Sequence, residues 1–167
     1  AMIKAANANA AQLGFVYLCN PNNPTGVIVS AKEVKQLLDG IPAGMPVLID
    51  EAYHHFVESP EYATSVPYVL EGRPVIIART FSKIAALAGL RLGYAIASKD
   101  IIAKMQPYTM CRINALVQHG IVTALKNTAS PDNGQTMVLN MLTRPTLQPP
   151  PSGPRTNTPP THPRLSN

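Results

Sequence analysis

The sequence has few of the residues that mark several large classes of protein. Aromatic residues make up 5% of the 167 residues, and there are two cysteines, Cys19 and Cys111. Both lie in apolar contexts, which favours reduced, buried thiols over a disulfide. No pair of histidines has the spacing of a helical two-ligand site, so we assign no metal and expect His54 and His55 to be solvent-side loop residues.

Long apolar runs are also absent. No run approaches the roughly 20 residues that a membrane-spanning helix needs, and no signal peptide opens the chain. We therefore expect a soluble, cytoplasmic fragment with no membrane partner.

Acidic residues are scarce in the second half of the chain. After Gly72 the only acids are Asp100 and Asp132, and the net charge is +5. A basic half is compatible with nucleic acid binding, but there is no cluster of Lys and Arg and interleaved aromatics are few. A phosphate-bearing small molecule, or an acidic segment outside this chain, explains the asymmetry at least as well. We expect no nucleic-acid partner.

Proline, in contrast, is abundant and unevenly placed. Eight of the 17 prolines fall between residues 145 and 167, where Leu147 and Leu165 are the only large apolar side chains. Such a segment cannot bury enough surface to offset its ordering entropy. The composition therefore predicts a folded domain over residues 1–128 and a disordered tail over 129–167, where the abrupt change also resembles a frameshifted reading.

Short apolar runs alternate with amphipathic segments along the folded part. Strands are predicted at 15–19, 47–49, 75–78 and 92–97, and helices at 30–40, 62–70, after Asp100 and at 114–126. Ser30 and Glu33 form a capping box at the first helix, and Asp100 is predicted to cap a later one. Continuous Val, Ile and Leu runs separated by helices indicate parallel strands covered on both faces, hence an α/β fold.

Three polar residues follow the predicted parallel strands. Asn23, Asp50 and Lys83 each come just beyond a strand's carboxyl end, the edge at which open α/β sheets bind ligands. Lys83 lies in a turn with Thr80 and Ser82. A lysine at a strand end among apolar residues can lose solvation and become a Schiff-base nucleophile.

The neighbouring residues fit the needs of pyridoxal phosphate. Its ring nitrogen requires an anion, and Asp50, if buried behind an apolar strand, would be costly without a cation beside it. Its phenolic oxygen requires hydrogen-bond donors, which Asn23 and Tyr53 can supply. Its phosphate requires cations and hydroxyls; Arg91, Thr80 and Ser82 provide them.

Each residue also has a structural interpretation when taken alone. The loop around Asn23 reads as an ordinary turn. Asp50 can cap a helix, Tyr53 can sit at the rim of a core, Lys83 can be a surface lysine, and Arg91 can anchor a salt bridge. The argument for a site rests on their combination.

Four motifs, in order and with similar spacing, resemble the large-domain motifs of the class I/II aminotransferases. They are Asn-Pro-Asn-Asn-Pro-Thr-Gly at 20–26, Asp-Glu-Ala-Tyr at 50–53, Thr-Phe-Ser-Lys at 80–83 and Ala-Gly-Leu-Arg-Leu-Gly-Tyr at 88–94. The residues of these motifs are most similar to those of the histidinol-phosphate aminotransferases. The resemblance implies a partial large domain of the type I pyridoxal-phosphate fold: a three-layer α/β/α domain with a mostly parallel sheet.

The resemblance also implies roles for the site residues. Lys83 would form the Schiff base with the cofactor and move the proton during transamination. Asp50 would pair with the pyridine nitrogen, and Asn23 and Tyr53 would bind the phenolic oxygen. The residues implied to bind the phosphate are Thr80, Ser82 and Arg91. The substrates would be an L-amino acid, with histidinol phosphate or an aromatic amino acid as candidates, and a 2-oxo acid, and the intact enzyme would be a homodimer.

The resemblance extends over about residues 14–126. Three features of the family have no match in this sequence. They are the glycine-containing loop that binds the phosphate, the aromatic residue that stacks on the cofactor ring, and the small domain with the arginine that binds the substrate carboxylate. We therefore expect weak or no activity from this chain alone. Three alternatives stay open: a decarboxylase or lyase of the same fold, a non-catalytic regulator domain, and a non-functional remnant.

Overall fold

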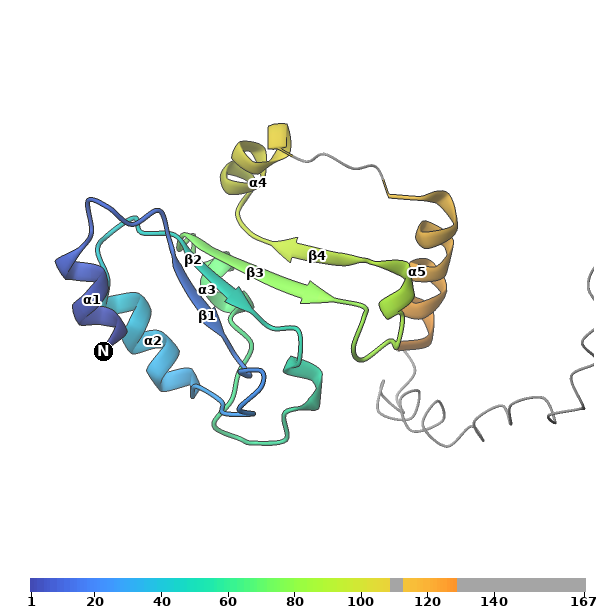
Figure 1. Ribbon diagram of the computed structural model, residues 1–167, viewed down its shortest axis with the longest axis horizontal. Helices are drawn as coiled ribbons and strands as arrows, with labels where there is room; N and C mark the ends of the chain where they lie inside the picture. The colour runs from blue at the N-terminus through green and yellow to red at the C-terminus, as the bar shows by residue number, and fades with distance from the viewer. Residues whose placement is uncertain (109–112, 129–167) are drawn as a thin grey trace, which may run out of the picture.

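The computed structural model describes residues 1–108 and 113–128 (Figure 1). The predicted proline-rich tail and Cys111 lie outside the described residues. The helices are α1 (Met2–Ala8), α2 (Ala31–Gly40), α3 (Val66–Leu70), α4 (Lys99–Met105) and α5 (Ala115–Thr128). The strands are β1 (Val16–Cys19), β2 (Val47–Asp50), β3 (Val75–Thr80) and β4 (Gly93–Ile96), and the 3-10 turns are η1 (His54–Phe56), η2 (Ala88–Leu90) and η3 (Gln106–Tyr108).

The strands form one mixed sheet in the order β1-β2-β3-β4. The β1–β2 and β2–β3 pairs are parallel, as predicted. β4, however, runs antiparallel to β3, with Thr80 opposite Gly93 and Ile77 opposite Ile96. The strand predicted at 92–97 therefore forms, and the sheet is mostly parallel, as expected; the connection over residues 81–92 holds the turn η2 and not the helix that usually makes a crossover to a parallel strand.

The core lies on one face of the sheet. Alternate strand residues are buried, among them Val47, Ile49, Val75 and Ile77, each 0% exposed. Val34 and Leu37 of α2, Ala6 of α1 and Val69 of α3 belong to the same buried cluster. The period of two places the intervening residues on the opposite face, where Tyr17 is 50% exposed. The described residues thus supply the sheet and one helical layer of a partial α/β/α domain.

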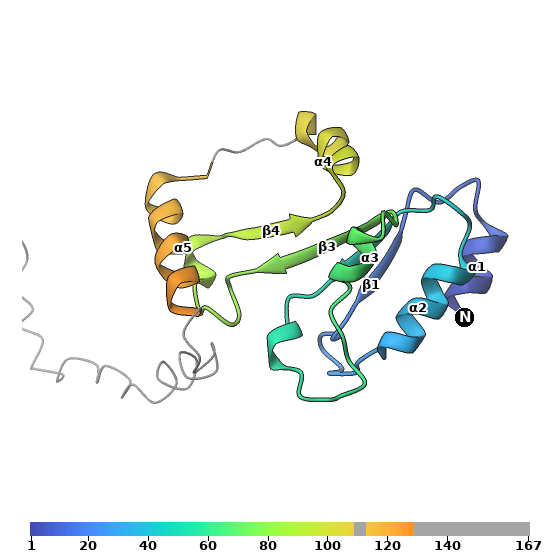
Figure 2. The same cartoon turned by 180° about the vertical axis from the view of Figure 1, so that it is seen from behind.

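The remaining helices lie away from this core. Figure 2 shows α4 and α5 at the two ends of β4, distant from α1 and α2. None of the helices in the described part of the chain is long and apolar enough to cross a membrane.

Helix starts follow local capping chemistry, with two corrections. Ser30 and Glu33 form the predicted capping box at α2. At α4 the cap is Ser98, whose hydroxyl accepts from the Ile101 amide, and not Asp100, which lies in the first turn. The predicted helix at 62–70 begins only at Val66. Thr64 and Ser65, directly before Val66, lie in a loop and donate to the carboxylate of Glu51, the residue that follows β2.

Candidate active site

The loop after β1 is braced by a buried asparagine. Asn20 is 1% exposed. Its side-chain amide donates to the Val29 carbonyl and its oxygen accepts from the Val29 amide, both at 2.9 Å. At the tip, Asn22 donates to the Thr25 hydroxyl at 2.7 Å. These bonds close the predicted turn and leave Asn23 exposed at its end.

Three of the predicted site residues meet at the carboxyl edge of the sheet. The Asn23 amide donates to the Tyr53 hydroxyl at 3.2 Å. The Lys83 ammonium lies over the Tyr53 ring, 5.1 Å from its centroid. Residues from the loops after β1, β2 and β3 therefore converge on one aromatic ring, although they are 30 residues apart or more in sequence.

Asp50 occupies a different environment from the one predicted. It is partly buried, and its carboxylate accepts from the Tyr17 hydroxyl at 3.1 Å and from the Ala52 amide at 3.0 Å. Partial burial, together with the hydrogen bond to Asp50, raises the pKa of Tyr17 to about 12. The carboxylate buried behind the apolar strand is instead that of Glu51, 1% exposed, because alternation along β2 places Glu51 on the core side with Ile49 and Asp50 on the opposite side.

The residues predicted to bind phosphate are only partly brought together. The Thr80 hydroxyl accepts from the Ser82 amide at 3.0 Å and donates to the Leu92 carbonyl at 3.2 Å. Arg91, with a left-handed φ of 53°, lies next in sequence to Leu92. Its guanidinium donates to the Ala88 carbonyl at 3.0 Å and so contacts its own loop.

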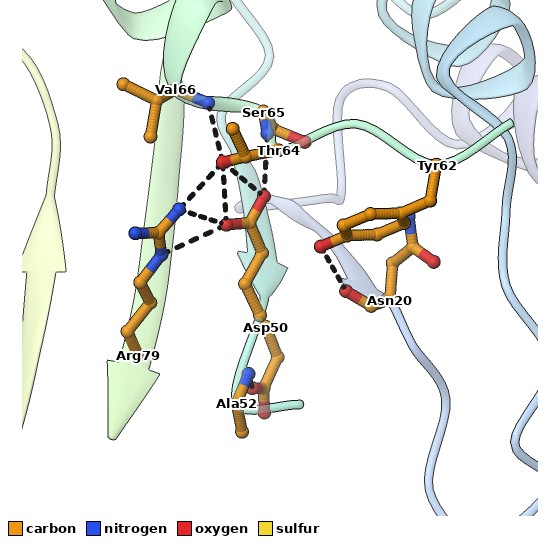
Figure 3. A network of polar contacts seen from close by, with 9 residues as sticks. Asn20, Asp50, Ala52, Tyr62, Thr64, Ser65, Val66 and Arg79 are labelled. Atoms are coloured by element: carbon orange, nitrogen blue, oxygen red, sulfur yellow. Dashed lines mark hydrogen bonds and ion pairs between the residues drawn. The ribbon is translucent and has the colours of Figure 1, made fainter. Parts of the chain in front are cut away.

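Behind these residues lies an ion pair that the sequence interpretation missed. Arg79 donates to one oxygen of the Glu51 carboxylate through Nε at 3.1 Å and Nη2 at 2.8 Å. Thr64 and the Ser65 amide complete the contacts, as Figure 3 shows around the Arg79 head group. Burial lowers the pKa of Arg79, but hydrogen bonds to Glu51 and Tyr94 outweigh it and raise the pKa above its usual value. The sequence feature that could have indicated this ion pair is the arginine directly before the Thr-Phe-Ser-Lys motif.

The two histidines after Tyr53 differ from each other. His55 is exposed, as expected, but His54 is partly buried and its Nε2 atom has no hydrogen-bond partner among the described residues. Burial, followed by the positive charges of Arg79 and His55, lowers the pKa of His54 to about 3. His54 is therefore neutral near pH 7.

A cavity of about 510 Å³ opens beside the Asn23–Tyr53 pair. Its lining combines residues of the two loops, including Pro24 and Ile28 from one and Phe56 and Glu58 from the other. Neither Lys83 nor Asp50 lines it. The cavity thus adjoins the converging side chains without containing the amine.

The donor set at the sheet edge fits pyridoxal phosphate. Lys83 supplies a primary amine, and Asp50 supplies a carboxylate. Tyr53 supplies a phenol that is hydrogen-bonded to the Asn23 amide. These match the aldehyde, phenolic oxygen and ring nitrogen of the cofactor. The hydroxyl and guanidinium groups that would suit its phosphate lie in the adjoining turn and loop.

Comparison with known proteins gives a consistent family signal. The profile of the family described as aminotransferase class I and II matches residues 1–147. A histidinol-phosphate aminotransferase from Maricaulis maris is 51% identical over 88 residues, which are 53% of this chain and 24% of that protein. One from Moorella thermoacetica is 44% identical over 120 residues, covering 69% of this chain and 30% of that protein.

Solved structures agree on the fold. L-threonine-O-3-phosphate decarboxylase from Porphyromonas gingivalis superposes with a TM-score of 0.63 at 28% identity, covering 71% of this chain and 36% of that one. The histidinol-phosphate aminotransferase from Sinorhizobium meliloti in complex with pyridoxal-5'-phosphate gives a TM-score of 0.68 at 24% identity, covering 85% of this chain and 38% of that chain. The chain therefore spans about a third or less of the length of the curated relatives cited above, and its fold is that of a partial type I domain.

Proposed function

Because the chain belongs to the class I and II aminotransferase family, whose members depend on pyridoxal phosphate, we propose that the protein of which it forms part transfers an amino group between an L-amino acid and a 2-oxo acid. Histidinol phosphate is the leading candidate for the amino donor, since the relatives cited above carry that activity in their names. The observation that carries the proposal is the convergence of Lys83 and Asn23 on Tyr53.

Each residue has a task in this proposal. The cofactor, when bound, supplies an electron sink for the carbanion formed on the amino acid. Lys83 provides the amine that holds the cofactor and moves the proton at the substrate carbon. Tyr53 and Asn23 orient the cofactor ring through its phenolic oxygen, and Asp50 keeps the ring nitrogen protonated.

The other proposed contacts complete the site. Thr80, Ser82 and Arg91 bind the phosphate once the Arg91 guanidinium leaves the Ala88 carbonyl. The intact protein is proposed to act in the cytoplasm as a homodimer. This chain alone is proposed to be weakly active or inactive, since it spans only part of its relatives.

Cofactor attachment tests the proposal directly. We expect incubation with pyridoxal phosphate, borohydride reduction and peptide mass spectrometry to place a label on Lys83. Lys83→Ala should abolish the label, whereas Lys99→Ala, which removes an exposed lysine from α4, should retain it. Labelling spread over surface lysines, with none on Lys83, would reject cofactor binding by this chain.

A decarboxylase is the second candidate, favoured by the similarity to the Porphyromonas enzyme. The parent protein, incubated with panels of L-amino acids and 2-oxo acids, should exchange amino groups. Release of carbon dioxide without formation of a new 2-oxo acid would reject transamination and favour decarboxylation.

A further inference from the structure

The Glu51–Arg79 ion pair lies directly behind the two halves of the proposed cofactor site. Glu51 falls between Asp50 and the Ala52-Tyr53 dipeptide, and Arg79 immediately precedes Thr80. The pair therefore joins the chain segment 50–53, at the end of β2, to the segment 80–83, at the end of β3. No cofactor contact is proposed for either member.

The geometry of the pair restricts how these segments can move. Arg79 places two N–H groups on the same carboxylate oxygen, at 3.1 and 2.8 Å. The Glu51 amide also donates to the Ala78 carbonyl at 2.9 Å, so that backbone and side chain both connect the two strand ends. Two N–H donors from a planar guanidinium define a direction as well as a distance.

A third segment closes the network. The Ser65 amide donates to Glu51 Oε1 at 2.7 Å, and the Thr64 hydroxyl donates to Glu51 Oε2 at 3.0 Å. The same hydroxyl accepts from Arg79 Nη2 at 2.7 Å. Figure 3 shows Thr64 and Ser65 beside the Arg79 head group. Both oxygens of the Glu51 carboxylate thus accept hydrogen bonds. α3 starts only after Ser65, because Thr64 and Ser65 use their polar groups to bind Glu51 and Arg79.

Stability alone does not account for such a pair. Replacing a buried ion pair by apolar residues of similar size is often neutral or stabilising, because removing the charges from water costs about as much as their attraction gains. A role in geometry explains the arrangement better. We propose that Glu51 and Arg79 are positioning residues that set the distance between Asp50–Tyr53 and Thr80–Lys83; the purpose of this spacing rests on the cofactor site proposed above.

An uncharged double variant separates positioning from stability. Glu51→Gln with Arg79→Met removes both charges at similar volume and keeps an oxygen that can accept from the Ser65 amide, so the chain should keep its fold and its unfolding midpoint. A matched control exists in the surface pair of Asp39 and Arg73, 2.6 Å apart, replaced as Asp39→Asn with Arg73→Met. Both doubles would be made in the full chain.

Hydrogen exchange reports the geometry without any cofactor. The Ala52 amide is bonded to Asp50 and the Ser82 amide to Thr80, both at 3.0 Å, one in each half of the site. We expect both amides to exchange about tenfold faster in the Glu51/Arg79 double variant and unchanged in the Asp39/Arg73 control. Unchanged exchange in a variant as stable as the original chain would overturn the proposal.

Cofactor affinity gives the second measurement. The dissociation constant for pyridoxal phosphate should rise about tenfold in the double variant and stay the same in the control. If the original chain binds no pyridoxal phosphate, cofactor binding by this chain fails and the exchange measurement alone decides the positioning role. Faster exchange with unchanged affinity in a chain that does bind would reject a role in the cofactor site.

A conservative variant covers the case in which the double variant does not fold. Arg79→Lys keeps the charge balance but offers a single ammonium in place of the two guanidinium contacts. We expect it to fold, to exchange at the Ala52 and Ser82 amides several-fold faster, and to bind pyridoxal phosphate less tightly. Exchange and affinity equal to those of the original chain would show that the fork geometry has no positioning role.

Discussion

The Lys83 ammonium stands 5.1 Å from the centroid of the Tyr53 ring, and the hydroxyl of the same ring accepts a hydrogen bond from Asn23. A cation over an aromatic face is attracted by about 0.5–1 kcal/mol at an exposed site. The contact therefore biases the orientation of a flexible lysine side chain, and it places the amine beside the phenol that is proposed to hold the cofactor ring.

The first prediction concerns Asn23 and Tyr53. Asn23→Ala and Tyr53→Phe should each weaken binding of pyridoxal phosphate by about 1 kcal/mol, because each removes one polar partner of the phenolic oxygen. The double variant should lose less than the sum, since the two side chains bond each other at 3.2 Å. Fluorescence titration measures the affinities, with Tyr108→Phe, at an 81% exposed site, as the control. Strict additivity would contradict the coupling.

The second prediction concerns Asp50 and Tyr17. The carboxylate contributes to the raised Tyr17 pKa of about 12 through a hydrogen bond and its charge. Asp50→Asn should therefore lower the pKa of Tyr17 toward 10, while partial burial keeps it from falling fully. Carbon NMR of the labelled tyrosine rings follows the titration, and Tyr17→Phe assigns the signal. An unchanged Tyr17 titration in Asp50→Asn would mean that the two groups do not interact in solution.

The strands and the site edge could be predicted from the sequence because their signals are local. Apolar runs and turn residues placed β1 and β2 within one residue at each end. The capping box at Ser30 depends on residues three apart. Given parallel strands, the ends of β1, β2 and β3 must meet at one edge, which is why Asn23 and Lys83 lie on the same side of the sheet and both contact Tyr53.

The features that were missed depend on contacts between distant residues. The direction of β4 is set by its pairing with β3, which leaves no pattern within residues 92–97. The buried carboxylate is Glu51 and not Asp50, and its partner Arg79 lies 28 residues away. A dipeptide of two acids does not indicate which one faces the core until the register of the strand is known.

The third prediction is a pH dependence of stability caused by His54. Its pKa is about 3 in the folded chain and near 6.5 in the unfolded one. Between these values the unfolded state binds a proton that the folded state excludes, so the free energy of unfolding falls as the pH is lowered below about 6.5. Contact of the ring with water narrows the gap between the two pKa values, so the stability lost between pH 7 and pH 5 is at most about 2 kcal/mol.

Urea unfolding at pH 7 and pH 5 measures this effect. His54→Gln removes the titrating group and should flatten the dependence over that interval. His55→Gln serves as the neighbouring control: contact of one part of the His55 ring with the protein, and the charge of Arg79, also lower the pKa of this more exposed histidine, so its removal should flatten the curve only in part. A slope in His54→Gln equal to that of the original chain would assign the pH dependence to other groups.

The last prediction concerns the approach of β4 to β3 at Gly93. A Cβ atom at this position would lie 2.7 Å from the Arg79 carbonyl oxygen, closer than van der Waals contact allows. Gly93→Ala should therefore push β4 away from β3 and lower the free energy of unfolding by about 1–3 kcal/mol.

Gly89 is the matched control, since nothing lies within 4 Å of a Cβ there, and Gly89→Ala should change stability by less than about 0.5 kcal/mol. The displacement also moves Arg91, two residues earlier, relative to Thr80, so cofactor affinity should fall in Gly93→Ala and not in Gly89→Ala. Equal unfolding free energies for the two variants would show that β4 does not pair closely with β3 in solution.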